Sequence, residues 1–249
     1  MSSTKLKKAP LQEVVFELRW EAERNTNGIK YDSGFELAQG QLYEKLKTEL
    51  GFPVYRKIVP EGVPALFFGM PLHQYWSGEF EWPVVQHGPG ILTINEVEKG
   101  YEWERTYKPK VEEVINSLCE VYSEPLNFRS AELKYVDAWE IAENENFQEF
   151  INKNFRVKMH NEYNLPGVVA GTGISQRFVL EEGSEMQVDI ANGVNNRTGK
   201  EATILTTTVR RVRSFKKQDI LEWLEYAHSK TSYIFKEILN PEFYASLDR

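Results

Sequence analysis

The chain has 249 residues, of which 41% are hydrophobic and 27% charged, and its formal net charge is −7. This composition is typical of a globular protein, and the acidic balance argues against a general nucleic-acid-binding protein. The single cysteine, Cys119, excludes an internal disulfide and favours a cytoplasmic protein. No apolar run is long enough to span a membrane, and the basic first ten residues lack the apolar segment of a secretory signal.

The first half of the chain predicts a strand, a helix, several strands and a second helix. The expected elements are strands at residues 12–20, 54–59, 65–69, within 72–83 and at 91–97, and helices at 34–50 and 109–122. Ser33 is expected to cap the first helix, and Gly51 to follow its C-terminal cap. Pro109 suits the first residue of the second helix. The alternating stretch Glu102-Trp103-Glu104 is interpreted as the solvent face of another strand.

The second half predicts a long strand, a short helix, three strands and a long last helix. These elements are expected at residues 130–141, 147–155, 174–182, 185–191, 201–212 and 219–239. The last helix carries a wide apolar stripe, which favours burial against a core or an interface. Asp219 and Glu222 have the spacing of a capping box, and Asn240-Pro241 is expected to end the helix.

Short links between consecutive strands favour antiparallel hairpins. The sequence therefore predicts an α+β fold, a mainly antiparallel sheet with helices packed on one face. The predicted fold has two similar β-α-β-β halves, 9–100 and 101–249, and a long C-terminal helix. Because residues 99–107 are aromatic and charged rather than linker-like, a single domain over 1–249 is expected.

Three segments lie in the order and at the distances seen in a sporadically distributed, functionally uncharacterised prokaryotic family. They are APLQEVVFELRW at 9–20, AELKYVDAWEI at 131–141 and WLEYAHSKTSYIFKEILNPEF at 223–243. The chain resembles this family over nearly its whole length, although Lys134 and Asp137 stand where the family commonly has Arg and Asn. The resemblance implies a bacterial or phage-linked cytosolic protein of a variable accessory locus, and it implies no catalytic residue.

Metal-binding and cofactor chemistry has little support in the sequence. The four histidines, His73, His87, His160 and His228, are scattered without the spacing of a zinc site. Neither a metal nor a cofactor is therefore expected. Cys119 is interpreted as a small buried hydrophobic residue of the second helix.

A basic cluster near the end of the last strand is the main electrostatic feature. Arg210, Arg211 and Arg213 precede Lys216 and Lys217 in an otherwise acidic chain. The arginines could clamp a phosphate or carboxylate, since guanidinium groups bind both bidentately. The alternative is a solvated strand end whose charges keep a sheet edge from pairing.

Asp137 and His228 are the weak catalytic candidates. Asp137 occupies an apolar-facing position of its strand, and a buried carboxylate needs a partner. His228 lies on the apolar stripe of the last helix. A structural Asp137–His228 pair is the favoured interpretation, and an acid–base pair is the alternative.

Together these features predict a non-enzymatic protein that binds another macromolecule, as a homodimer or with a partner protein. Nucleic acid is a less favoured ligand. The alternative function is an enzyme acting on a phosphorylated or nucleotide substrate through the arginine clamp, with Asp137 or His228 as acid or base.

Overall fold

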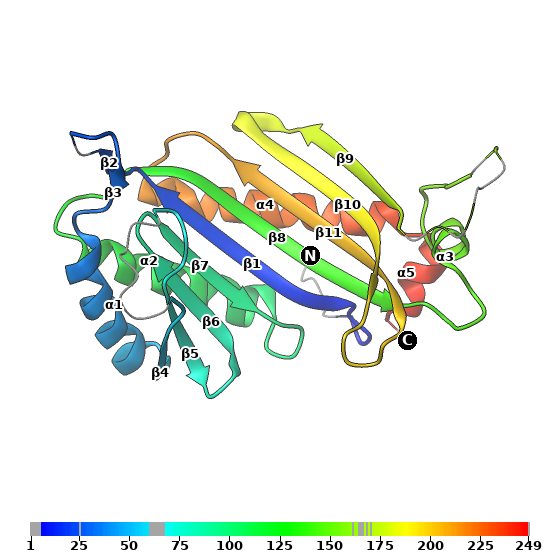
Figure 1. Ribbon diagram of the computed structural model, residues 1–249, viewed down its shortest axis with the longest axis horizontal. Helices are drawn as coiled ribbons and strands as arrows, with labels where there is room; N and C mark the ends of the chain where they lie inside the picture. Colours follow the sequence, from blue (N-terminus) through cyan, green and yellow to red (C-terminus); the bar gives the residue numbers. More distant parts are fainter. Residues whose placement is uncertain are drawn as a thin grey trace. The chain divides into compact units, whose positions relative to one another are not determined.

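The computed structural model describes residues 6–24, 26–59, 68–160, 162–163, 167, 169 and 171–248. A nine-stranded antiparallel sheet has the order β4-β5-β6-β7-β1-β8-β11-β10-β9 (Figure 1). Its strands are β1 (Leu11–Trp20), β4 (Val54–Lys57), β5 (His73–Gly78), β6 (Glu81–Gly88), β7 (Ile91–Glu96), β8 (Phe128–Glu140), β9 (Gly173–Val179), β10 (Ser184–Val194) and β11 (Glu201–Arg211). The short strands β2 (Glu23–Arg24) and β3 (Lys30–Tyr31) form a separate ribbon.

The helices are α1 (Phe35–Glu49), α2 (Lys108–Val121), α3 (Phe147–Asn154), α4 (Lys217–Ile238) and α5 (Pro241–Ser246). A π-helical turn, Trp103–Tyr107, leads into α2, and a 3₁₀ turn, Glu181–Gly183, joins β9 to β10. These elements confirm the predicted α+β fold, its antiparallel sheet and its long C-terminal helix. None of the described helices is both long and apolar enough to cross a membrane.

The chain divides into two compact units. Unit 1 comprises residues 1–13, 134–209 and 225–249, and unit 2 comprises residues 14–133 and 210–224. The boundaries fall inside β1, β8, α4 and the end of β11 rather than in loops. The expected single domain with halves 9–100 and 101–249 stays a prediction.

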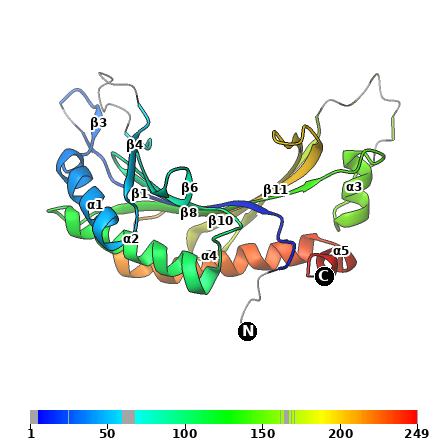
Figure 2. The ribbon, with the colours of Figure 1, turned by 90° about the horizontal axis from the view of Figure 1, so that it is seen from below.

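In unit 2, the alternation of β1 determines which face of the strands is buried. Val14, Phe16 and Leu18 are fully buried, and Phe16 and Leu18 lie opposite Ile94 and Leu92 of β7. Helix α1 packs on this face, where Phe35 contacts His73 and His87 at ring separations of 5.7 and 5.0 Å. Helices α1 and α2 lie side by side (Figure 2) and are linked by an ion pair of 2.7 Å between Lys45 and Glu120.

The N-terminus of α1 is held by Asp32 rather than by the predicted cap Ser33. No side chain caps the helix at Gly34, and the Ser33 hydroxyl donates to Glu23. One carboxylate oxygen of Asp32 accepts from the Gly34 amide at 3.2 Å. The other accepts from the indole of Trp20, the hydroxyl of Tyr122 and the amide of Gly90, at 2.9, 2.9 and 3.1 Å. Asp32 therefore ties four segments of unit 2 together, which the local pattern around Ser33 does not indicate.

Unit 1 packs α4 against one face of β8. Trp139 stacks on Phe235 at 6.3 Å, and Tyr135 contacts the ring of His228 at 6.1 Å. The predicted helix α3 begins with a capping box, in which Asn146 and Glu149 each accept from the other's backbone amide at 3.0 Å. Its end pairs with the end of α4 through the Phe155–Leu239 bridge.

Two sequence expectations differ from the structure, and a third falls mostly outside the described residues. The region expected to hold one strand within 72–83 contains two, because the chain turns at residues 79–80 between β5 and β6 and β6 continues through Pro83. Residues 103–107 are helical rather than extended, since Trp103 and Tyr107 are both buried at the i, i+4 spacing of a helical face. Most of the expected strand 65–69 lies outside the described residues.

The last helix starts two residues earlier than predicted, at Lys217. Asp219 therefore lies in the first turn, where its carboxylate accepts from the Lys216 amide at 3.1 Å, rather than at the cap itself. Its apolar stripe is buried within the chain, at Ile220, Trp223, Leu224, Ala227, Thr231 and Ile238. The stripe consequently gives no support for a homodimer, which stays a prediction.

Candidate functional site

The arginines of the predicted anion clamp lie at and just after the end of β11, in unit 2. Arg210 and Arg213 are exposed, and the half-buried Arg211 lies over the ring of Phe215 at 5.5 Å. Nearby, Arg129 donates to Ser214 at 2.6 Å and pairs with Glu21. Anion binding by this cluster stays a prediction.

The catalytic candidates Asp137 and His228 lie in unit 1. His228 contacts the Tyr135 hydroxyl through Nδ1 at 2.9 Å and Ser232 through Nε2 at 3.4 Å. Asp137 is only 6% exposed, and no hydrogen bond or ion pair joins it to His228 within the described residues. Burial in apolar surroundings raises the pKa of Asp137 to about 7. The predicted pair is therefore not formed, and the arginines belong to the other unit.

Two of the four histidines do meet, although the sequence spacing gave no sign of it. His73 and His87 lie opposite each other on β5 and β6. Burial is the main cause that lowers their pKa values, to about 4 and about 3, so both rings are neutral near pH 7. Aromatic rings surround them, and no group of three or more His, Cys, Asp or Glu side chains suited to a metal occurs in the described part of the chain.

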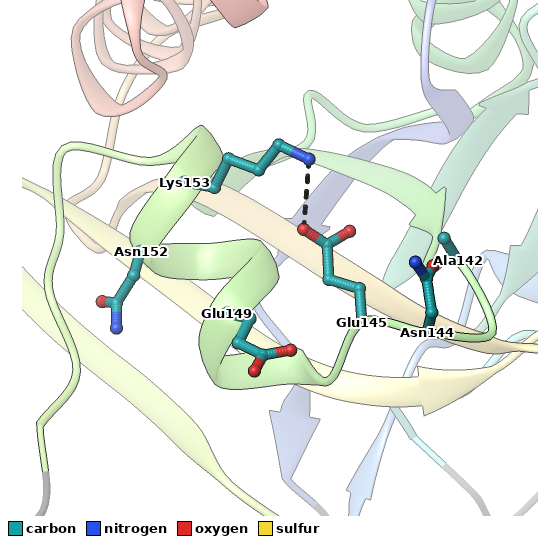
Figure 3. Close-up of a pocket in the computed structure, with 6 residues that line it drawn as sticks. All are labelled: Ala142, Asn144, Glu145, Glu149, Asn152 and Lys153. Carbon is teal, nitrogen blue, oxygen red and sulfur yellow. Dashed lines mark hydrogen bonds and ion pairs between the residues drawn. The ribbon is translucent and has the colours of Figure 1, made fainter.

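A shallow pocket lies beside α3 in unit 1 (Figure 3). Its polar lining is largely engaged in local structure: Glu149 forms the capping box, and Lys153 pairs with Glu145 at 3.3 Å. Asn152 both donates to and accepts from the backbone of Met159, at 2.9 and 2.7 Å. The pocket thus offers few polar groups for a ligand.

The most organised polar surface lies on the unit 2 strands, on the face away from α1. Residues opposite each other in neighbouring antiparallel strands share a face of the sheet. The printed registers place one polar side chain from each of five strands in a single row: Arg56, Gln74, Gln86, Thr93 and Glu17. This face carries no described helix of unit 2 (Figure 2).

Hydrogen bonds link the middle of this row. The indole of Trp76 donates to Gln74 at 3.2 Å, and Gln74 donates to Gln86 at 2.9 Å. Gln86 donates in turn to Thr93 at 3.0 Å, and Thr93 donates to Asn95 at 2.9 Å. A connected network of this kind fixes the orientation of each amide. Thr93 and Asn95 are buried, at 4% and 7% exposure, so the preorganised part that a ligand can reach is the half-buried end at Gln74, Trp76 and Gln86.

An arginine contacts two aromatic rings at the outer end of the row. The Arg56 guanidinium is 3.8 Å from the ring centre of Phe80 and 5.6 Å from that of Trp76. Trp82 meets Trp76 edge to face at 5.4 Å. Phe80 is 69% exposed and Trp82 is 36% exposed. Among the described residues, no carboxylate pairs with Arg56, although an arginine that contacts rings retains all five of its N–H donors.

Phe80 also adopts an unusual backbone conformation. With a φ of 60° it is one of two described residues other than glycine in the left-handed region. Bulky side chains disfavour this region by roughly 1–2 kcal/mol, and strain of this kind is found mainly at functional sites. The exposed, strained Phe80 at this hairpin turn therefore makes this end of the sheet a candidate functional site.

We name this surface the amide–aromatic face. It comprises Glu17, Arg56, Gln74, Trp76, Phe80, Trp82, Gln86, Thr93 and Asn95. The sequence indicated an aromatic strand within 72–83 but not its partners, because the row forms only when five strands pair. The repeated alternation of polar residues and tryptophan at positions 74, 76, 82 and 86 was the available signal.

Comparison with known proteins identifies no relative: no protein-family model, no curated protein and no solved structure matches the chain. The resemblance to the sporadic prokaryotic family thus stays a proposal.

Proposed function

We propose that the protein functions by binding another macromolecule, and that the amide–aromatic face is the surface it uses. The observation that carries this proposal is Arg56, whose guanidinium contacts the rings of Trp76 and Phe80 and has no acidic partner among the described residues. A partly buried cation without a counter-ion is costly, and a ligand that supplies an acceptor would offset this cost.

The chemical character of the face supports binding rather than catalysis. Trp82 and Phe80 provide exposed ring surface, which is enriched in binding sites, and the amides beside them are already oriented. The face also lacks an activated nucleophile or an acid–base pair among its described members. A cytoplasmic location, membership of the prokaryotic family, a place in an accessory locus, and self-association or a partner protein belong to the same proposal.

Oxidative footprinting tests the surface without assuming the ligand. The purified protein is labelled with hydroxyl radicals alone and in a dialysed cell extract, from which small molecules have been removed. We expect Phe80 and Trp82 to be protected in the extract. Tyr233 of α4 is 63% exposed and serves as the matched aromatic control, with unchanged labelling. Equal labelling of all three side chains with and without extract would refute the proposed surface.

Self-association has a separate test. Light scattering after size exclusion measures the molar mass of the purified protein, and a homodimer predicts twice the mass of one chain. A monomeric mass over a range of concentrations would leave only the partner molecule in the proposal.

A further inference from the structure

We propose that the amide–aromatic face binds single-stranded nucleic acid, with a phosphate at Arg56 and a base stacked on Trp82 or Phe80. This inference rests on the proposed function and names its ligand. The amide–aromatic face combines a cation with exposed rings, so a matching ligand carries an anionic oxygen group and a flat ring on one polymer. A nucleotide strand has both.

The anionic group is inferred from the state of Arg56. Its guanidinium has no described carboxylate partner and contacts two rings, 3.8 Å from the centre of Phe80 and 5.6 Å from that of Trp76. A guanidinium presents paired N–H donors that match the oxygens of a phosphate. Phosphate contacts of this kind position a nucleic acid without selecting its sequence.

The flat ring is inferred from the exposed aromatics. Trp82 lies on the same face as Trp76 and remains 36% exposed, and Phe80 is 69% exposed at the adjacent turn. Unpaired bases stack on such side chains irrespective of sequence. Gln74 uses one of its two amide N–H groups within the row, so the other can reach the edge of a stacked base.

The charge balance favours a single strand over a duplex. Arg56 is the one cation without a carboxylate partner among the residues that define the face. Arg19 lies on the same side of β1 but pairs with Glu17 at 2.5 Å, and the whole chain has a net charge of −7. A duplex buries its bases in the stack and is held mainly through many phosphate contacts. A face with one free cation and two exposed rings must instead gain its affinity from stacking. We therefore expect binding that depends only weakly on salt.

Fluorescence anisotropy with labelled ten-nucleotide strands tests this assignment. The probes are single-stranded oligo-dT and oligo-dA, an abasic strand of equal length, a duplex of equal length and a glutamate-rich peptide. We expect both base-bearing single strands to bind. The logarithm of the affinity should fall with the logarithm of salt concentration with a slope of about −0.7, the value for one neutralised phosphate on a single strand.

Variants identify the contacts. Trp82→Ala should weaken binding about 5- to 150-fold, the loss expected for one stacked base. Arg56→Gln should weaken binding and remove the salt dependence, because the phosphate contact is lost. Tyr233→Ala and Arg177→Gln are the matched controls, since both replace exposed side chains of unit 1 and should leave binding unchanged. Thermal unfolding of every variant checks that it is folded.

Several outcomes would overturn the assignment: equal affinity for the duplex or the abasic strand, preference for the acidic peptide, or no binding to any strand. Protection of Trp82 in the extract combined with no strand binding would refute nucleic acid as the ligand while the proposed function stands. If Trp82 were not protected in the extract and no strand bound, both the proposed function and the nucleic-acid ligand would be refuted.

Discussion

Asp137 allows a quantitative test of the packing in unit 1. Burial raises its pKa from an ordinary 3.8 to about 7, and no described group pairs with it. The folded protein therefore retains a proton that the unfolded chain releases above its own pKa. This contribution to stability is complete below about pH 4 and is lost as the pH rises towards 7. Asp137→Asn removes the titration while nearly preserving the shape of the side chain.

The expected size follows from the two pKa values. A shift of one pKa unit corresponds to about 1.4 kcal/mol, so the rise in the pKa of Asp137 by about three units corresponds to roughly 4 kcal/mol of unfolding free energy. Asp137→Asn should match the wild type near pH 4 and exceed it by up to this amount at pH 8. For a chain of this length the difference corresponds to a melting temperature higher by roughly 8–16 °C.

Urea denaturation at pH 4, 5, 6, 7 and 8 measures the difference between the two proteins. The titration of His73 and His87, whose pKa values burial lowers, is common to both and cancels in the subtraction. A difference that does not change with pH would refute the reasoning. A wild type more stable than the variant at pH 8 would show that the ionised carboxylate has a partner.

Further predictions concern local structure, and urea denaturation measures the first three. Phe80→Gly should be about 1–2 kcal/mol more stable than Phe80→Ala, because only glycine relieves the left-handed backbone; equal stability would contradict the strain. Asn146→Ala should cost about 1 kcal/mol through loss of the α3 cap, while Asn144→Ala, with no capping bond, should cost little. Asp32→Ala should cost roughly 3 kcal/mol or more, since four donors lose their acceptor; a cost below about 1 kcal/mol would contradict that role. If the predicted anion clamp exists, Arg211→Ala should abolish phosphate binding in a calorimetric titration, and unchanged binding would eliminate it.

The local periodicity of the sequence was sufficient to predict those helices and strands whose two faces differ in polarity. The alternation in β1 and the spacing of apolar residues in α2 predicted both elements within about two residues. Prediction failed where a local pattern has two solutions. Trp103 between two glutamates is compatible with a strand face and with a helical turn, and only the burial of Tyr107 four residues later selects the helix.

The candidate site was harder to predict for a different reason. Glu17 and Thr93 are neighbours only because β1 pairs with β7, and Arg56 joins them through β4 and β5. No short segment contains this row. The sequence instead drew attention to Asp137, His228 and the arginines, which are conspicuous by residue type. The structure assigns those arginines to one unit and the acid and histidine to the other.

The register of β6 has a consequence for how this protein can change. Successive residues of a strand point to opposite faces, so Gln86 lies on the amide–aromatic face while Val85 and His87 are buried beneath α1. Insertion of a single residue into β6 would exchange the two sets and place an amide in the core. The same strand register therefore determines which residues of β6 lie on the surface and which lie in the interior of unit 2. Substitutions can alter the ligand while keeping the fold, but a shift of one residue would destroy both together.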